Sequence, residues 1–144
     1  MFSKACEYGI RATIYIALQS LESRRVSLKE IADEIDSPVA FTAKILQLLS
    51  KNNIVESVKG AHGGFEISKA HIDSIKLSAI VYAIDGDSIY AGCGLGLTEC
   101  NAHKPCPAHD KFVAIRDDLR NMLENTSLYE MTTGLETGLT YLKR

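Results

Sequence analysis

The sequence predicts a mainly α-helical fold with a small β-hairpin, and three observations lead to this fold class. Apolar residues recur at spacings of three and four in three segments that end by about residue 51. A glycine-rich turn between two short apolar runs follows at residues 54–68, and a further helical stripe occupies residues 108–125. The composition is 46% hydrophobic, which is enough for a packed core. Two short helices followed by a hairpin form a winged helix-turn-helix, here continued by a long C-terminal helix.

The first two helices are predicted from apolar stripes and from a capping signal. Residues 5–20 carry one stripe, formed by Ile10, Ile14, Ala17, Leu18 and Leu21. The second helix follows Ser27, because Ser27 and Glu30 have the spacing of a capping box. Its buried stripe is expected to consist of Leu28, Ile31, Ala32 and Ile35.

The third helix is predicted to begin with Ser37 as its N-cap and Pro38 at its first helical position, and to end near Lys51. Its two faces separate in the sequence. The inward face is expected to consist of Phe41, Ile45, Leu48 and Leu49. The outward face is expected to consist of Ala40, Ala43, Lys44, Gln47 and Lys51.

The hairpin is predicted from a strand at residues 54–58, a turn at 59–64 and a returning strand at 65–68. A short apolar helix at residues 77–84 then closes the first domain, which we assign to residues 1–86. Residues 87–107 have no regular period and contain most of the cysteines, so we assign them as a cofactor loop.

The last segment, residues 108–144, is predicted to hold a long helix at 108–125 and a final short helix after residue 127. The long helix has a narrow apolar stripe, formed by Phe112, Ile115, Leu119, Met122 and Leu123. Such a stripe is typical of a helix–helix seam. Since the first domain closes its own core, we expect the seam to join two copies in a homodimer. The alternative is packing onto the same chain's core.

The outward face of the third helix is the candidate DNA-reading surface. Ala40 and Ala43 allow close approach, while Lys44 and Gln47 reach bases or phosphates. Ser37 and the free amides of the helix start are expected to hold a phosphate.

The hairpin supplies a second contact through Lys59, Gly60 and His62, which suit a minor groove. The chain has a net charge of −2, so DNA binding requires a local basic patch. The alternative is a winged helix that binds protein.

The cysteine-rich loop is the candidate cofactor site. Cys93, Cys100, Cys106 and His109 follow one another with gaps of six, five and two residues. Thiolates and imidazoles hold iron–sulfur clusters or zinc. The wide, glycine-rich spacing favours a larger, multi-atom cofactor such as an iron–sulfur cluster, which can be absent from purified protein. Zinc and a cluster-free thiol switch stay open as alternatives.

Further candidates for the fourth ligand are less direct. His103 is the second choice after His109, and Glu7 is a weaker choice that would have to come from a partner subunit. We expect Cys6 to be a half-buried small hydrophobic residue.

Other function classes are disfavoured. The apolar stretches are too short to span a membrane and no targeting segment is evident, so we expect a cytoplasmic protein. An enzyme is not expected, because no nucleophile–base set, paired carboxylates or phosphate-binding loop accompanies the cysteines. An electron-transfer protein remains a minor alternative.

Several motifs resemble the Rrf-type bacterial transcription regulators, the winged-helix family that includes IscR, NsrR and CymR. These are residues 7–12 (EYGIRA), the capping-box helix, residues 54–60 (IVESVKG) with Gly63-Gly64-Phe65, and the three-cysteine loop before a long helix. The resemblance spans nearly the whole chain. It implies a homodimeric DNA-binding regulator, which we expect to be a repressor, on a roughly palindromic operator.

In cluster-binding members, three cysteines hold a [2Fe–2S] or [4Fe–4S] cluster with a variable fourth ligand. We expect the operator affinity of this chain to respond to such a cluster, or to a redox or nitric oxide signal. The resemblance therefore implies Cys93, Cys100 and Cys106 as ligands, with His109 matching the IscR-like pattern. Glu7 matches the position where other subfamilies supply an acid from the partner. Lys59 stands where members usually have a wing arginine. The first cysteine gap is one residue longer than in IscR-like members, and Ala43 replaces an acidic residue on the third helix.

Overall fold

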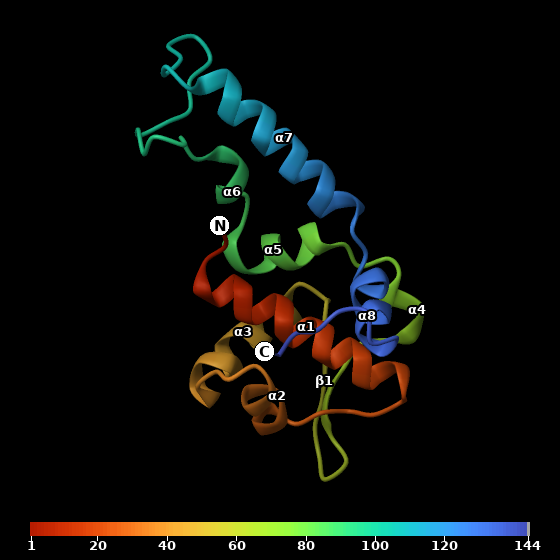
Figure 1. Cartoon of the computed structure of the whole chain (residues 1–144). Coiled ribbons are helices and arrows are strands. Elements are labelled where there is room, and N and C mark those ends of the chain that lie inside the picture. Colours follow the sequence, from red (N-terminus) through yellow and green to blue (C-terminus); the bar gives the residue numbers. More distant parts are fainter. Residues whose placement is uncertain (144) are drawn as a thin grey trace.

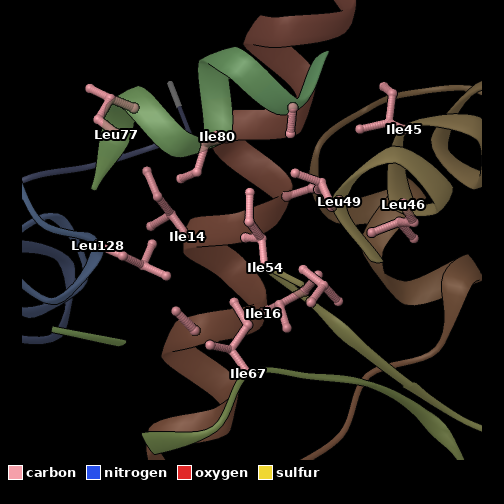
Figure 2. Packing of buried hydrophobic residues seen from close by; sticks show 14 of the residues in the cluster. Ile14, Ile16, Ile45, Leu46, Leu49, Ile54, Ile67, Leu77, Ile80 and Leu128 are labelled. Atoms are coloured by element: carbon pink, nitrogen blue, oxygen red, sulfur yellow. The ribbon is translucent and has the colours of Figure 1, made fainter. Parts of the chain in front are cut away.

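Helix α1 (Lys4–Leu21) is the centre of the fold, and elements from both halves of the chain pack around it (Figures 1 and 2). The computed structural model describes residues 1–143. Ile14 and Ala17 are buried as the stripe predicts, and Ile16 is fully buried as well. Ile16 was not part of the predicted stripe, because α1 is covered on more than one side and a single-stripe pattern does not describe such a helix.

Helix α2 (Leu28–Glu34) begins with the predicted capping box. Ser27 Oγ accepts a hydrogen bond from the Glu30 amide at 3.1 Å, and Glu30 Oε2 accepts one from the Ser27 amide at 2.9 Å. The motif is confirmed, and the structure satisfies two amides that the helix itself leaves without a partner.

The predicted N-cap of the third helix is wrong. Helix α3 (Val39–Lys51) begins one residue later than expected, and Pro38, not Ser37, is its N-cap residue. The Ser37 amide donates to the Ala32 carbonyl at 3.0 Å, which holds Ser37 against the end of α2. Its hydroxyl is buried and has no hydrogen-bond partner within the described residues. Ser37 therefore cannot offer this hydroxyl to a phosphate in the observed conformation.

The predicted inward face of α3 is wrong at one position. Leu48 is 39% exposed, whereas its neighbour Leu46 is 1% exposed and Thr42 is fully buried. Leu46 is buried because α3 packs against α2 and lies beside the hairpin as well as against α1. Ile45 and Leu49 are buried as predicted (Figure 2).

The hairpin consists of strands β1 (Glu56–Val58) and β2 (Gly64–Glu66), which pair antiparallel with Ser57 opposite Phe65. Both strands are shorter than predicted. Ile54 and Val55 are buried ahead of the strand and belong to the core instead. Phe65 also exchanges two backbone hydrogen bonds with Val26, so the base of the hairpin is tied to the α1–α2 connection.

The second half of the chain joins the same core. Helix α5 (Leu77–Asp85) is as predicted, whereas the short helices α4 (Lys69–Ile72) and α6 (Ser88–Ala91) were not predicted. Helix α7 (His109–Asn125) and helix α8 (Leu128–Glu136) match the two predicted C-terminal helices. Leu123 and Leu128 are fully buried in the cluster around α1. Residue 144, the end of the predicted C-terminal segment, lies outside the described residues.

No helix in residues 1–143 combines the length and the apolar character that a bilayer crossing requires.

Cys6 is fully buried rather than half-buried, and its thiol lies beside Asp85. Burial, followed by the charge of Asp85 and a hydrogen bond to it, raises the pKa of Cys6 to about 12 from an ordinary 9.0. The folded state therefore keeps this proton at a pH where the unfolded chain releases it. Stability linked to Cys6 is complete below pH 9 and decreases as pH rises toward 12.

We expect the Cys6→Ala variant to lose less stability than wild type between pH 9 and pH 11. The difference in slope is at most about 1.4 kcal/mol per pH unit, since one proton is involved. Urea unfolding at a series of pH values measures it. Parallel pH profiles for the two proteins would contradict the assignment.

Candidate functional site

The outward face of α3 is solvent-exposed where a DNA-reading surface requires it. Ala40, Lys44 and Gln47 are exposed, and Ala43 is partly so. Between this face and the hairpin lies a groove of about 360 Å³, which is lined by Leu28, Ala43, Leu46, Gln47, Ser50, Ser57 and Phe65. The helix face and one face of the hairpin thus form one continuous surface. Ser57 and Phe65 were not anticipated as part of it; they pair directly across the two strands, which puts their side chains on the same face of the hairpin.

The hairpin turn projects away from the helices, at the opposite end of the molecule from the predicted cofactor loop, residues 87–107, called the cysteine segment below (Figure 1). Lys59, Gly60 and His62 are all exposed in this turn. The Gly63 amide donates to the Gly60 carbonyl at 3.0 Å, and Gly60 has a φ of 105°, which favours glycine. The structure therefore places the predicted hairpin residues on a thin, protruding loop.

The charged side chains on and near the hairpin differ in whether they form ion pairs. On the face away from α3, Arg25 forms an ion pair with Glu66 at 2.9 Å, and nearby Arg24 pairs with Glu30. Within residues 1–143, neither Lys44 nor Lys59 forms an ion pair. No carboxylate of the described residues pairs with these two ammonium groups, so both remain available to a polyanion.

The four predicted cofactor ligands lie as two pairs. Cys100 Sγ lies 3.5 Å from His109 Nδ1. Cys93 interacts with the Cys106 thiol, and the backbone amides of residues 95 and 97 point at its sulfur. These amides are the main reason why the pKa of Cys93 is lowered, with the Cys106 contact a smaller contribution. All three cysteines are partly exposed, and none of them forms a disulfide within the described residues.

The donor set suits an iron–sulfur cluster in its chemistry, since three thiols and an imidazole occupy one segment at the start of α7. The donors are not gathered around one point: in the described part of the chain, no group of three or more His, Cys, Asp or Glu residues has the arrangement of a metal site. A bound cluster would therefore have to draw the two pairs together.

The two weaker ligand candidates lie apart from these pairs. The His103 side chain is exposed, and its backbone amide donates to Asn101 Oδ1. Glu7 lies on α1, where it forms an ion pair with Lys4 at 3.3 Å. Neither contacts a cysteine through a hydrogen bond within the described residues.

Arg116 is a residue of this site that the sequence analysis missed. Its Nη2 atom donates to Cys100 Sγ at 2.9 Å. Cys100, His109 and Arg116 line a cavity of about 530 Å³, together with Tyr90, Ala91, Ala102, Val113, Asp117 and Arg120. Helical spacing could have indicated it: residues 109, 113, 116 and 120 lie on one face of α7, so Arg116 shares a face with the predicted ligand His109.

The apolar stripe of α7 divides into three parts. Leu123 and Leu119 pack against the chain's own core. Phe112 lies against the cysteine segment, because a Cβ atom at Gly94 would come within 2.6 Å of its ring. Ile115 and Met122 remain 61% and 45% exposed. The predicted seam is thus wrong for Leu123, which its own chain buries completely, while Phe112 and Leu119 are half-buried by the same chain and Ile115 and Met122 are exposed.

Known proteins resemble this chain over most of its length. The sequence profile of the Rrf2 family, described as "Iron-dependent Transcriptional regulator", matches residues 2–134. A protein of Aquifex aeolicus described as an HTH-type transcriptional regulator is 31% identical over 133 residues, which cover 91% of this chain and 90% of that protein. The HTH-type transcriptional regulator IscR of Erwinia tasmaniensis is 28% identical, over 90% of this chain and 76% of that protein.

Solved structures show the same fold. CymR of B. subtilis, the global cysteine regulator, superposes with a TM-score of 0.75 at 22% identity, covering 92% of this chain and 96% of that one. T. potens IscR superposes with a TM-score of 0.74 at 20% identity, covering 99% of this chain and 93% of that one. The predicted fold class, mainly α-helical with a hairpin wing, is confirmed.

Proposed function

The chain belongs to the Rrf2 family of transcriptional regulators, and we propose that it is a DNA-binding repressor whose operator affinity responds to chemistry at its cysteine segment. Its relatives are regulators and not enzymes, in agreement with the sequence analysis. The observation that carries the proposal is the surface formed by α3 and the hairpin. It combines small residues, hydrogen-bonding side chains and two exposed lysines, Lys44 on α3 and Lys59 on the hairpin turn, that form no ion pair within residues 1–143.

In the proposed complex, α3 lies in the major groove. Ala40 and Ala43 allow the helix to approach, Gln47 pairs with a base edge, and Lys44 contacts a base or a phosphate. The hairpin enters the adjacent minor groove with Lys59, Gly60 and His62. Family regulators bind DNA, and the exposure of these side chains supports this assignment.

The proposed active form is a homodimer on a palindromic operator, with the exposed part of α7 as its interface. Ile115 and Met122 are apolar and exposed on a helix that leads away from the core (Figure 1). A second copy with the same stripe would bury both residues and set the distance between the two α3 helices.

We expect Ile115→Asp to weaken self-association at least about tenfold, because each interface would then bury two unpaired carboxylates. Analytical ultracentrifugation over a concentration series measures this. Ala114→Asp, an exposed position next to it in α7, is the matched control. An unchanged dimer for Ile115→Asp would contradict this interface.

For the sensing step, we propose that Cys93, Cys100, Cys106 and His109 hold an iron–sulfur cluster. When bound, such a cluster supplies a redox- and nitric oxide-sensitive centre at the start of α7. Forming it requires the two donor pairs to approach each other, which would reorder the loop between Gly92 and Cys106. Since this loop packs on Phe112, the reordering would act on α7 and on the proposed dimer.

A thiol switch is the second candidate, and one contact favours it. The Cys93 and Cys106 thiols already interact, and the pKa of Cys93 is lowered. A peroxide could therefore oxidise this pair to a disulfide with loss of two protons and two electrons to the peroxide.

The deciding experiment is a visible absorption spectrum with iron and sulfide analysis on protein purified without air. We expect broad visible absorption with matching iron and sulfide contents. This absorption should be lost in Cys106→Ser and retained in Cys6→Ala. Colourless wild-type protein after reconstitution with iron and sulfide would reject the cluster and leave the thiol switch. Operator affinity measured with and without the cluster, at the same salt concentration, then tests the coupling. Equal affinities would reject it.

A further inference from the structure

The guanidinium of Arg116 links the long helix α7 to two stretches of the cysteine segment, residues 90–92 and Cys100. Arg116 Nη1 donates to the carbonyls of Tyr90 and Gly92, at 3.1 Å and 2.8 Å. Its Nη2 donates to Cys100 Sγ at 2.9 Å, and its Nε contacts the carbonyl of Phe112 at 3.4 Å. These contacts join the end of α6, the start of the loop and a cysteine to the middle of α7.

The charge of Arg116 has no carboxylate partner among residues 1–143. Its only side-chain acceptor there is the sulfur of Cys100, and its other acceptors are neutral carbonyls. The nearby Arg120 differs, because its guanidinium stacks on the Tyr90 ring with 4.6 Å to the ring centroid. Arg120 has no hydrogen bond to a cysteine within the described residues. The two arginines lie one turn apart in the same cavity, yet only Arg116 contacts a sulfur.

We propose that Arg116 is the positioning residue of the cysteine segment: it anchors residues 92–100 on α7 and transmits the state of the Cys100 sulfur to that helix. The anchoring part stands on the contacts alone. The transmission part rests on the proposed function, since it requires Cys100 to be a cluster ligand. A planar guanidinium can donate hydrogen bonds to a sulfur and two carbonyls at once. The single ammonium group of lysine cannot do so with the same geometry.

The two parts have different physical consequences. Without the guanidinium, the carbonyls of Tyr90 and Gly92 lose their donors and the loop loses its fixed start. In a cluster-loaded protein, an N–H donor and a positive charge at a ligand sulfur stabilise the reduced cluster. Removing them therefore lowers the reduction potential, an effect that a purely structural role would not produce.

The test compares Arg116→Gln and Arg116→Lys with Arg120→Gln, which removes the same charge from the same cavity. Amide hydrogen exchange on metal-free protein reports the anchor. We expect exchange in residues 92–100 to increase at least about tenfold in Arg116→Gln, to a smaller extent in Arg116→Lys, and not in Arg120→Gln. Exchange in α1 and α3 stays unchanged and shows that each variant folds. Equal exchange for Arg116→Gln and Arg120→Gln would overturn the anchor.

The sulfur contact is tested on protein reconstituted anaerobically with ferrous iron and sulfide. We expect a lower midpoint potential and faster loss of iron to a chelator in Arg116→Gln, with Arg116→Lys closer to wild type and Arg120→Gln near wild type. An unchanged potential in Arg116→Gln would overturn the transmission part. If wild type takes up no cluster, the proposed cluster fails and transmission with it, while the exchange data still decide the anchor.

Discussion

Removing Lys44 and Lys59 together is expected to lower operator affinity by two to three orders of magnitude. The proposed dimer carries each lysine twice, and we expect a loss of about 1 kcal/mol for each of the four ammonium groups assigned to phosphates or bases. Both side chains are exposed and free of ion pairs in the described residues, so no internal carboxylate reduces their effect. The Lys44→Ala, Lys59→Ala variant should keep its fold, because neither residue contributes to the core.

Fluorescence anisotropy at several salt concentrations measures this effect, with an operator first selected from random duplexes by the wild-type protein. The salt slope should decrease by about four, one for each lost phosphate contact, if all four lysines contact phosphates. Lys104→Ala, Lys111→Ala removes the same charge outside the winged domain and serves as the control. If both double variants lose affinity equally, the loss comes from net charge and the assigned surface is wrong.

Placing alanine at Gly63 is expected to reduce operator affinity about a hundredfold while the helices remain folded. A Cβ atom there would overlap the Val58 carbonyl oxygen and lie 2.9 Å from the Lys59 carbonyl carbon. Both obstacles are backbone atoms, so the turn has to open to admit the methyl group. Opening costs about 1–3 kcal/mol in each subunit and moves Lys59 away from the groove.

Gly86→Ala is the matched control for the glycine variant. Gly86 has a positive φ of 66°, so alanine strains the backbone there too, but no atom lies within 4 Å of the added Cβ and the position is outside the hairpin. Circular dichroism checks the helices and anisotropy measures operator binding. Affinity equal to wild type for Gly63→Ala would show that the hairpin does not enter the DNA interface in its observed shape.

Local signals in the sequence predicted the elements that depend on neighbouring residues. The capping box at Ser27 is satisfied by Glu30 three residues later, so the sequence contains all of its atoms. Ser37 has an equally good local signal, yet its amide bonds Ala32 across the turn and its hydroxyl is buried. Tertiary packing decided that position, and packing of a second face explains why Leu46 rather than Leu48 is buried.

For the candidate site too, the sequence predicted what depends on local pattern and residue type, and not the contacts between distant residues. Exposed residues of α3 and the hairpin follow from periodicity, and the cysteines from their residue type. The pairing of Cys93 with Cys106, and of Cys100 with His109, does not follow from spacing in an irregular loop. Arg116 meets acceptors 16, 24 and 26 residues earlier in the chain, and no local pattern indicates such contacts.

The position of the hairpin and the cysteine segment at opposite ends of the molecule has a consequence for how such a protein can diversify (Figure 1). The two surfaces share no residue, and the buried cluster around α1 lies between them. If the two surfaces act as proposed, substitutions in α3 or the hairpin turn can alter the recognised DNA sequence without changing the chemistry at the loop. Substitutions in the loop can alter the signal without changing the DNA sequence. Duplicated genes on this scaffold can therefore exchange inputs and targets independently.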